Sequence, residues 1–127
     1  MSAFDDAIAG AMDTARSVAG RSVGFRRPSS GQSVQIVAVV GETRFEAGEL
    51  YGDIVLAQKR RDYIVAAEDL KLGGEQVRPE AGDEIVEVRD GVRHVYELMD
   101  LGTEKHYREL ADGRHLRLHV KYVGTEP

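Results

Sequence analysis

Cysteine and tryptophan are absent from the chain, and aromatic residues make up only 6% of its 127 residues. Without cysteine, the protein has no disulfide framework, no thiolate metal site and no cysteine nucleophile. Long apolar runs are also absent, since none approaches the roughly 20 residues that a membrane-spanning helix needs. The amino terminus begins with Phe4-Asp5-Asp6 instead of the basic and then apolar segment of an export signal. We therefore expect a soluble, unexported protein made in a reducing cytoplasm.

Positive charge is scarce as well, because 17 Lys and Arg stand against 22 Asp and Glu, which gives a net charge of -5. Proteins that bind phosphate backbones over a whole surface use lysine and arginine to displace counterions, so this balance disfavours general DNA binding. A surface past which DNA only slides is compatible with it, since mild repulsion prevents sticking. The length and the 42% hydrophobic content suit one domain with a modest core.

The first twenty residues have helical periodicity. Apolar side chains recur at the three-and-four spacing that places them on one helical face. These are Phe4, Ala7, Ile8, Ala11, Met12, Ala15, Val18 and Ala19. The spacing predicts a helix over residues 4–19 that ends at Gly20. Because alanine dominates the stripe, the helix buries little area per turn, allows close approach of another element or subunit, and is marginal alone.

From Ser22 onward the periodicity changes to two, and short runs rich in valine, isoleucine and tyrosine indicate strands. The predicted strands are residues 22–27, 34–40, 54–59, 62–66, 83–89, 93–99 and 115–122. Two tight-turn sequences, Pro28-Ser29-Ser30-Gly31 and Asp90-Gly91, predict hairpins between the strands that flank them. The predicted fold class is mainly β: a small antiparallel β-barrel or sandwich of about seven short strands, with an N-terminal α-helix and long loops.

Two charged stretches without sustained alternation, residues 41–53 and 101–113, are predicted to be long connections of functional importance. We divide the chain into an N-terminal helical segment (residues 1–20), a β-barrel domain (residues 21–123) and a flexible tail (residues 124–127).

The histidines do not form a metal-binding pattern. His115 and His119 lie in a segment that alternates like a strand, in which Leu116, Leu118 and Val120 are predicted to point inward and His119 outward. We therefore interpret the four histidines, His94 and His106 included, as solvated strand-face residues.

No enzyme motif is evident. The carboxylate pairs Glu68-Asp69 and Asp83-Glu84 lie in sequences typical of a helical turn and of a turn that starts a strand. Gly73-Gly74 lacks the residues of a phosphate-binding loop, and no nucleophile elbow surrounds any serine. The sequence predicts no catalytic activity, no cofactor and no metal.

Basic residues cluster in two places, and both are candidates for contacts between subunits or with partner proteins. The clusters are Arg26 and Arg27, with Arg21 near them, and Lys59, Arg60 and Arg61. The simpler interpretation is a pair of solvated turns. The alternative is charge complementarity across subunits, because the chain also carries acidic residues for these arginines to meet.

The order of the segments resembles a known family. The series runs Val23-Gly24-Phe25-Arg26-Arg27, Val37-Ala38-Val39-Val40-Gly41-Glu42-Thr43-Arg44-Phe45-Glu46, Arg61-Asp62-Tyr63-Ile64-Val65-Ala66-Ala67-Glu68-Asp69-Leu70, Pro79-Glu80-Ala81-Gly82-Asp83-Glu84-Ile85, Val95-Tyr96-Glu97-Leu98 and Leu116-Arg117-Leu118-His119-Val120-Lys121. Over residues 22–121 it resembles the small head-tail joining proteins of tailed phages, prophages and gene-transfer-agent-like particles. Order and spacing carry this resemblance, more than any single motif.

The resemblance implies a non-enzymatic virion protein of the neck, made in the bacterial host cytoplasm, with no membrane association. It implies a homo-oligomeric ring, of six copies by analogy, that acts as a stopper or head-completion ring. The portal and adaptor proteins would lie above this ring and the tail terminator or tail tube proteins below it. Double-stranded DNA would pass through the channel without sequence-specific binding. One of the two long loops, residues 41–53 or residues 101–113, would project into the channel. We prefer the first, because it carries Glu42, Glu46, Glu49 and Asp53.

Three other functions are open at this level. A tail terminator or tail-completion subunit is also a ring of small β-rich proteins. A β-barrel nucleic-acid-binding module requires that Phe25, Tyr51 and Tyr63 converge on one exposed patch. A small hydrolase requires a concave pocket with perturbed titratable groups.

Overall fold

The computed structural model describes residues 3–51, 54–100 and 105–127, except for the side chains of residues 16, 42–51 and 54–60. The elements in chain order are α1 (Ala3–Ala19), β1 (Arg21–Arg27), β2 (Gln32–Tyr51), β3 (Ile54–Ala66), the 3₁₀ turn η1 (Ala67–Asp69), β4 (Lys71–Leu72), β5 (Glu75–Gln76), β6 (Glu84–Arg89), β7 (Val92–Leu98), β8 (Tyr107–Leu110) and β9 (His115–Glu126). The architecture is mainly β with one N-terminal helix, which confirms the predicted fold class.

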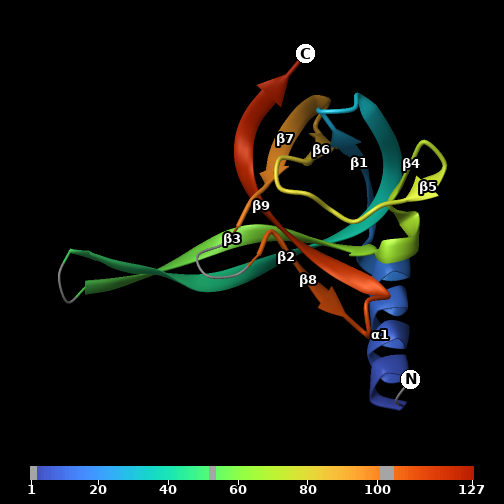
Figure 1. The fold of residues 1–127 in the computed structure, drawn as a ribbon, viewed down its shortest axis with the longest axis horizontal. Helices are drawn as coiled ribbons and strands as arrows, with labels where there is room; N and C mark the ends of the chain where they lie inside the picture. The colour runs from blue at the N-terminus through green and yellow to red at the C-terminus, as the bar shows by residue number, and fades with distance from the viewer. Residues whose placement is uncertain (1–2, 52–53, 101–104) are drawn as a thin grey trace.

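Six strands close into an antiparallel barrel. The strand order is β3-β2-β1-β6-β7-β9, and β3 pairs back onto β9 (Figure 1). Strand β8 lies outside this ring and pairs with the first half of β9, while β7 pairs with the second half. Closure leaves the six barrel strands with partners on both sides, which removes the exposed edges of an open sheet.

The two predicted hairpin turns are confirmed. Asp90 and Gly91 join β6 to β7 with φ angles of 52° and 77°, the positive values that a two-residue type I′ turn requires. Between β1 and β2, the backbone N–H groups of Ser30 and Gly31 both donate to the carbonyl oxygen of Arg27. These turns fix the register of two of the barrel's hairpins.

The hydrophobic core fills the barrel interior, because alternate side chains of each strand point inward. The buried cluster consists of Val23, Phe25, Ile36, Ala38, Tyr63, Val65, Leu70, Ile85, Tyr96, Leu98, Leu116, Leu118 and Val120. Leu116, Leu118 and Val120 are the inward residues that strand alternation predicted for β9.

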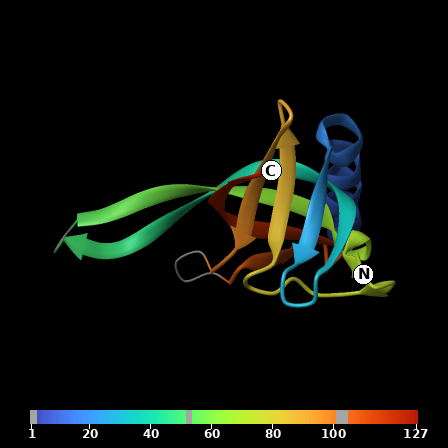
Figure 2. The same ribbon diagram turned by 90° about the horizontal axis from the view of Figure 1, so that it is seen from above.

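The prediction of a loop over residues 41–53 is wrong, because β2 continues as a strand to Tyr51. The predicted strands 54–59 and 62–66 are likewise one strand, β3, so the basic residues between them do not interrupt it. Together β2 and β3 form a long two-stranded arm that leaves the barrel (Figures 1 and 2). Alternation of apolar and polar residues is required only where one face of a strand packs on a core. The arm extends beyond the core, so its sequence does not alternate.

Two other expectations about connections are revised. Within residues 101–113, Tyr107–Leu110 forms β8, and the turn after it has positive φ angles at Ala111, Asp112 and Gly113. At the carboxyl terminus, β9 runs to Glu126 and pairs there with Arg93, although a flexible tail was predicted from residue 124. An arginine pair described below holds Glu126 against the barrel.

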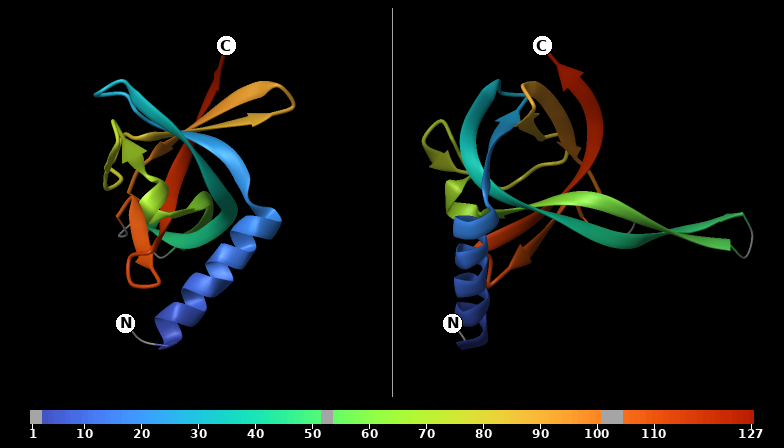
Figure 3. Two further views of the ribbon diagram at one scale, coloured as in Figure 1. Left: turned by 90° about the vertical axis from the view of Figure 1, so that its right-hand side faces the viewer. Right: turned by 180° about the vertical axis from the view of Figure 1, so that it is seen from behind.

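The N-terminal helix has the predicted extent and ends before Gly20. It lies outside the barrel, on the side opposite to the arm (Figures 1 and 3). In the described part of the chain, no helix combines the length and apolar character needed to cross a membrane.

Candidate assembly surfaces

The arm is the largest feature that the barrel core does not support. Beyond Gly41 and Asp62, the described pairing of β2 and β3 is only with each other. The ten residues after Gly41, up to Tyr51, reach roughly 33 Å at about 3.3 Å per residue. A two-stranded ribbon of this kind is marginally stable alone in water.

Six of the residues predicted to face the channel or to contact other subunits lie on the arm or between its two strands in the sequence. Glu42, Glu46 and Glu49 are on β2, and Lys59 and Arg60 are on β3. Their side chains, and Asp53 as a whole, lie outside the described residues. Their channel-facing and contact roles therefore stay predictions, now attached to a strand pair instead of a loop.

At the root of the arm, a buried carboxylate joins β3 to β9. Asp62 is fully buried, and its two oxygens lie 3.0 Å from His119 Nδ1 and 3.0 Å from an Arg117 guanidinium nitrogen. The prediction that His119 is solvated is wrong, since the side chain is fully buried. His119 lies on the outward side of β9, and its backbone is hydrogen-bonded to the chain after β7: His119 N–H donates to His106 O, and Met99 N–H donates to His119 O.

Arg26 and Arg27, predicted as contact residues, both have partners within their own chain. Arg26 Nε donates to Glu84 at 2.7 Å, and its terminal nitrogens donate to Glu126 at 2.8 and 2.9 Å. The Arg26 hydrogen bond, together with Arg93, lowers the pKa of Glu126 to about 2 despite the opposing effect of desolvation.

Arg27 makes a bidentate pair with the buried Asp83, at 3.0 Å for each nitrogen. Asp83 also accepts the backbone N–H of Glu80 at 2.8 Å, which fastens the turn before β6. The Asp83-Glu84 pair is thus engaged with two arginines in structural ion pairs. An intersubunit role for either arginine would require an exchange of partners.

Arg61, the third predicted contact residue that is described, belongs to a buried polar cluster at one end of the barrel. Glu87, only 1% exposed, accepts hydrogen bonds from Tyr63 Oη at 2.6 Å, Arg61 at 2.8 Å and Arg21 at 2.7 Å. Burial opposes ionisation of Glu87, but these three hydrogen bonds lower its pKa to about 2. Burial and the Glu87 carboxylate raise the pKa of Tyr63. The cluster holds a negative charge inside the barrel and links β1, β3 and β6.

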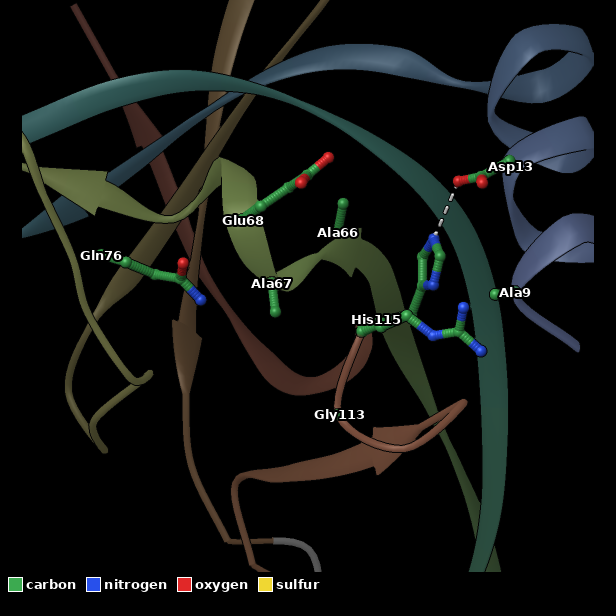
Figure 4. Close-up of a pocket in the computed structure, with 9 residues that line it drawn as sticks. Ala9, Asp13, Ala66, Ala67, Glu68, Gln76, Gly113 and His115 are labelled. Atoms are coloured by element: carbon green, nitrogen blue, oxygen red, sulfur yellow. Dashed lines mark ion pairs between the residues drawn. The ribbon is translucent and has the colours of Figure 1, made fainter. Parts of the chain in front are cut away.

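The helix contacts the barrel through few groups. Ala9 is the helix residue that the barrel buries among those described, at 6% exposed. Two side-chain contacts flank it. Asp6 lies 3.2 Å from an Arg114 guanidinium nitrogen. Asp13 lies 3.2 Å from His115 Nε2, as Figure 4 shows. His115 is itself buried, so the prediction that it is solvated is also wrong.

A pocket of about 380 Å³ lies between the helix, η1 and the turn before β9 (Figure 4). Its lining is Ala9, Asp13, Ala66, Ala67, Glu68, Gln76, Gly113, Arg114 and His115. This lining supplies a histidine-aspartate pair but no serine, threonine, cysteine or lysine nucleophile for it to activate. Among the described residues, no group of three His, Cys, Asp or Glu side chains is placed to hold a metal ion.

A nucleic-acid-binding platform would require Phe25, Tyr51 and Tyr63 to converge on one exposed patch, and the described side chains do not meet this requirement. Phe25 and Tyr63 are fully buried in the barrel core, and the side chain of Tyr51 lies outside the described residues. Base stacking needs exposed rings, so Phe25 and Tyr63 cannot provide it.

Neither the Glu87 cluster nor the Asp62 pair was predicted from the sequence. One signal was available for Glu87, which lies two residues from the core residue Ile85 and therefore on the inward face of β6. Asp62 and His119 are 57 positions apart and meet through the pairing of β3 with β9, about which strand alternation contains no information.

Two comparisons with known proteins bear on these surfaces. No curated protein matches the chain. A family model described as "Phage head-tail joining protein" matches residues 1–127, the whole chain. The chain therefore belongs to the phage head-tail joining protein family, whose members are structural components of the virion at the head-tail junction and contact other connector proteins.

Proposed function

We propose that this protein forms the stopper, or head-completion, ring of the head-tail connector, with six copies around the DNA channel. The ring joins the portal and adaptor of a DNA-filled capsid to the tail terminator and tail tube. The observation that carries the proposal is a closed barrel with two extensions on opposite sides, the β2–β3 arm and α1 (Figure 1). The hydrophobic core of the barrel supports neither extension.

A closed barrel suits a ring subunit because the barrel itself, apart from the arm, presents no free sheet edge for uncontrolled pairing. Ring closure then requires repeated heterologous contacts, in which one surface of each copy meets a different surface of the next. An arm of roughly 33 Å has the reach for such a contact, since it projects well beyond its own barrel.

The arm also supports a role at the channel. It carries Glu42, Glu46 and Glu49 on one strand, and Asp53 follows that strand in the sequence. Carboxylates beside passing DNA repel its phosphates, so DNA slides without being held. The net charge of -5 fits the same requirement.

Electron microscopy of particles assembled with and without this protein tests the proposal. We expect DNA-filled capsids and finished tails that lie unjoined when the protein is absent, and a ring of density at the joint when it is present. Tails that fail to finish would instead assign the protein to the tail-completion ring. Normally joined particles without the protein would contradict both functions.

A further inference from the structure

Arginines occupy the inward side of the barrel at one end, beyond the hydrophobic core. Arg21 and Arg61 each lie two positions before a core residue of β1 and β3. Arg89 lies two positions after the buried Glu87 on β6. Side chains two positions apart on a strand share a face, and β3 runs parallel to β1 while β6 runs antiparallel to both. The three arginines therefore project inward at the same end of the barrel, which we call the arginine mouth.

The three guanidinium groups of the arginine mouth share one carboxylate. Arg21 and Arg61 donate to Glu87 at 2.7 and 2.8 Å. An Arg89 guanidinium nitrogen lies 3.3 Å from the same carboxylate. Three positive charges against one negative charge leave a surplus of two, counted over the described side chains. Glu42, which pairs with Arg61 in the β2–β3 register, is not in this count because its side chain lies outside the described residues.

An arginine cluster on the outer wall of the barrel is balanced by comparison. Its two arginines, Arg26 and Arg93, share two carboxylates, Glu84 and Glu126. The arginine mouth differs, because its positive charges outnumber the carboxylate that they contact. The chain as a whole has a net charge of -5, so this local surplus does not reflect a generally basic surface. An anion on another molecule is attracted to such a surplus.

Aromatic rings hold two of the guanidinium groups in place. Arg61 lies over the rings of Tyr63 and Tyr96, 5.4 Å from each centroid. Arg89 lies 5.7 Å from the centroid of Tyr96 and donates to its hydroxyl at 2.8 Å. A guanidinium group fixed in this way loses little conformational entropy when it binds a second anion. The side chains of Arg21, Arg61 and Arg89 are still 47%, 31% and 33% exposed, so an anion can reach them from solvent.

An exposed tyrosine lies beside the arginines. The ring of Tyr122 packs edge-on against Tyr96, with 5.2 Å between the centroids, and its hydroxyl lies 3.0 Å from His94 Nδ1. These contacts fix the ring, yet 48% of Tyr122 is exposed. Val92, which is also exposed, lies opposite Arg89 in the β6–β7 register. Fixed tyrosine and arginine side chains at the centre of a patch are the groups that carry most of the binding energy in protein interfaces.

We propose that the arginine mouth binds a carboxylate side chain from an acidic, partly apolar segment of a neighbouring connector protein. The arginines already bind a carboxylate in Glu87, and apolar side chains of the same segment cover the ring of Tyr122. Nucleic acid fits less well, because binding to phosphates at physiological salt requires an extended basic surface. The inference does not depend on the ring and stopper roles proposed above, since contact with other connector proteins belongs to the family.

NMR titration of the free protein tests the site. The probe is a short, end-blocked peptide of alternating glutamate and leucine, and its control is the same peptide with glutamine in place of glutamate. We expect the glutamate peptide to shift the Nε–H signals of Arg21, Arg61 and Arg89 and the ring signals of Tyr122, and the glutamine peptide to leave them unchanged. Absence of shifts with the glutamate peptide, or equal shifts with both peptides, would overturn the proposal. Larger shifts with inorganic phosphate or a short DNA duplex would also overturn it, because the mouth would then be a phosphate site.

Two substitutions with opposite expected signs separate binding from a purely structural role. Arg89→Gln should weaken binding of the glutamate peptide roughly tenfold, because a charge-assisted contact is lost. Arg78→Gln, at an exposed arginine that pairs with Glu109, is the matched control and should bind normally. Glu87→Gln should strengthen binding, since it raises the surplus from two positive charges to three. Thermal unfolding shows which variants are folded at the titration temperature. Unchanged binding by folded Arg89→Gln, or unchanged or weaker binding by folded Glu87→Gln, would contradict the proposal.

A suppressor screen identifies the protein that supplies the carboxylate. Arg21→Glu should lower the number of joined particles in a complementation assay, and Arg78→Glu should not. We expect second-site substitutions of an acidic residue by lysine or arginine in another connector protein to restore joining. Normal joining with Arg21→Glu would overturn the proposal. Suppressors that map only to acidic residues of this chain would overturn it as well, because the occupant would then be a second copy.

Discussion

At the scale of single residues, the barrel combines an apolar core with buried charges that each have several partners. Glu87 is the clearest case, with Tyr63, Arg61 and Arg21 as hydrogen-bond donors. A carboxylate that leaves water is stabilised only when such donors replace the lost hydration. The cluster therefore specifies which strands meet at that end of the barrel.

Glu87→Gln should lower the free energy of unfolding by about 2 kcal/mol at pH 7, because charge-assisted hydrogen bonds are lost while the partly exposed arginines remain screened by solvent. The folded-state pKa of Glu87 is depressed from 4.5 to about 2. The contribution is therefore present above pH 4.5 and is lost as the pH falls toward 2. Urea unfolding across this range should show the difference between wild type and variant shrinking. Glu75→Gln, at an exposed site in β5, should show no such pH dependence.

Asp62→Asn should cost about 3 kcal/mol, since it removes the negative charge from a fully buried carboxylate that faces Arg117 and His119. Chemical denaturation measures the loss. The control is Asp112→Asn, at an exposed turn position. An unchanged stability for Asp62→Asn would show that this contact is not needed to hold β3 against β9.

At the scale of secondary-structure elements, the arm and the barrel are separable. The described core residues all lie outside the arm, and the register pairs Thr43 with Arg60 just beyond its root. Barrel folding and arm function are thus expected to depend on different parts of β2 and β3.

Deletion of residues 44–59, with Thr43 joined to Arg60 through Asn-Gly, should leave a barrel that melts cooperatively within a few degrees of wild type. A two-residue type I′ turn closes a paired position of this kind. The shortened protein should fail to join capsids to tails in a complementation assay. The matched control inserts Asn-Gly between Gly52 and Asp53 and keeps the full arm with all of its acidic residues. Particle joining by the shortened protein, or loss of cooperative melting, would contradict the separation.

At the scale of the whole molecule, the protein is an acidic structural component of the head-tail junction, and its family is structural rather than catalytic. The arm and α1 project from opposite sides of one closed barrel, so a single small domain offers distant contact points (Figure 2). Contacts of this kind are what a connector protein requires.

We expect no binding of the free subunit to double-stranded DNA at about 0.15 M salt in an electrophoretic mobility assay. The net charge of -5 opposes association with phosphates, and binding driven by counterion release needs a basic surface. Substitution of Glu42, Glu46 and Glu49 by lysine should produce weak binding that disappears as salt rises. Salt-sensitive binding by the wild-type subunit would contradict the proposal that DNA passes without being held.

The sequence by itself determined the local structure. Its periodicity predicted the helix that ends before Gly20 and the inward residues of β9, and Asp90-Gly91 predicted the turn between β6 and β7. These features depend on neighbouring residues, since backbone sterics and alternation act within a few positions. The order of segments also predicted the family.

Only the tertiary structure decided what depends on long-range pairing. The arm was predicted as a loop because no core imposes alternation on it. His119 was predicted as solvated because its partner Asp62, which the β3–β9 pairing places against it, is distant in sequence. The same holds for α1: its sequence indicates an apolar stripe, but only the structure shows that Asp6, Ala9 and Asp13 lie against β9 and the turn before it. The residue pattern determines the composition of each surface, and only the fold determines which other residues pack against it.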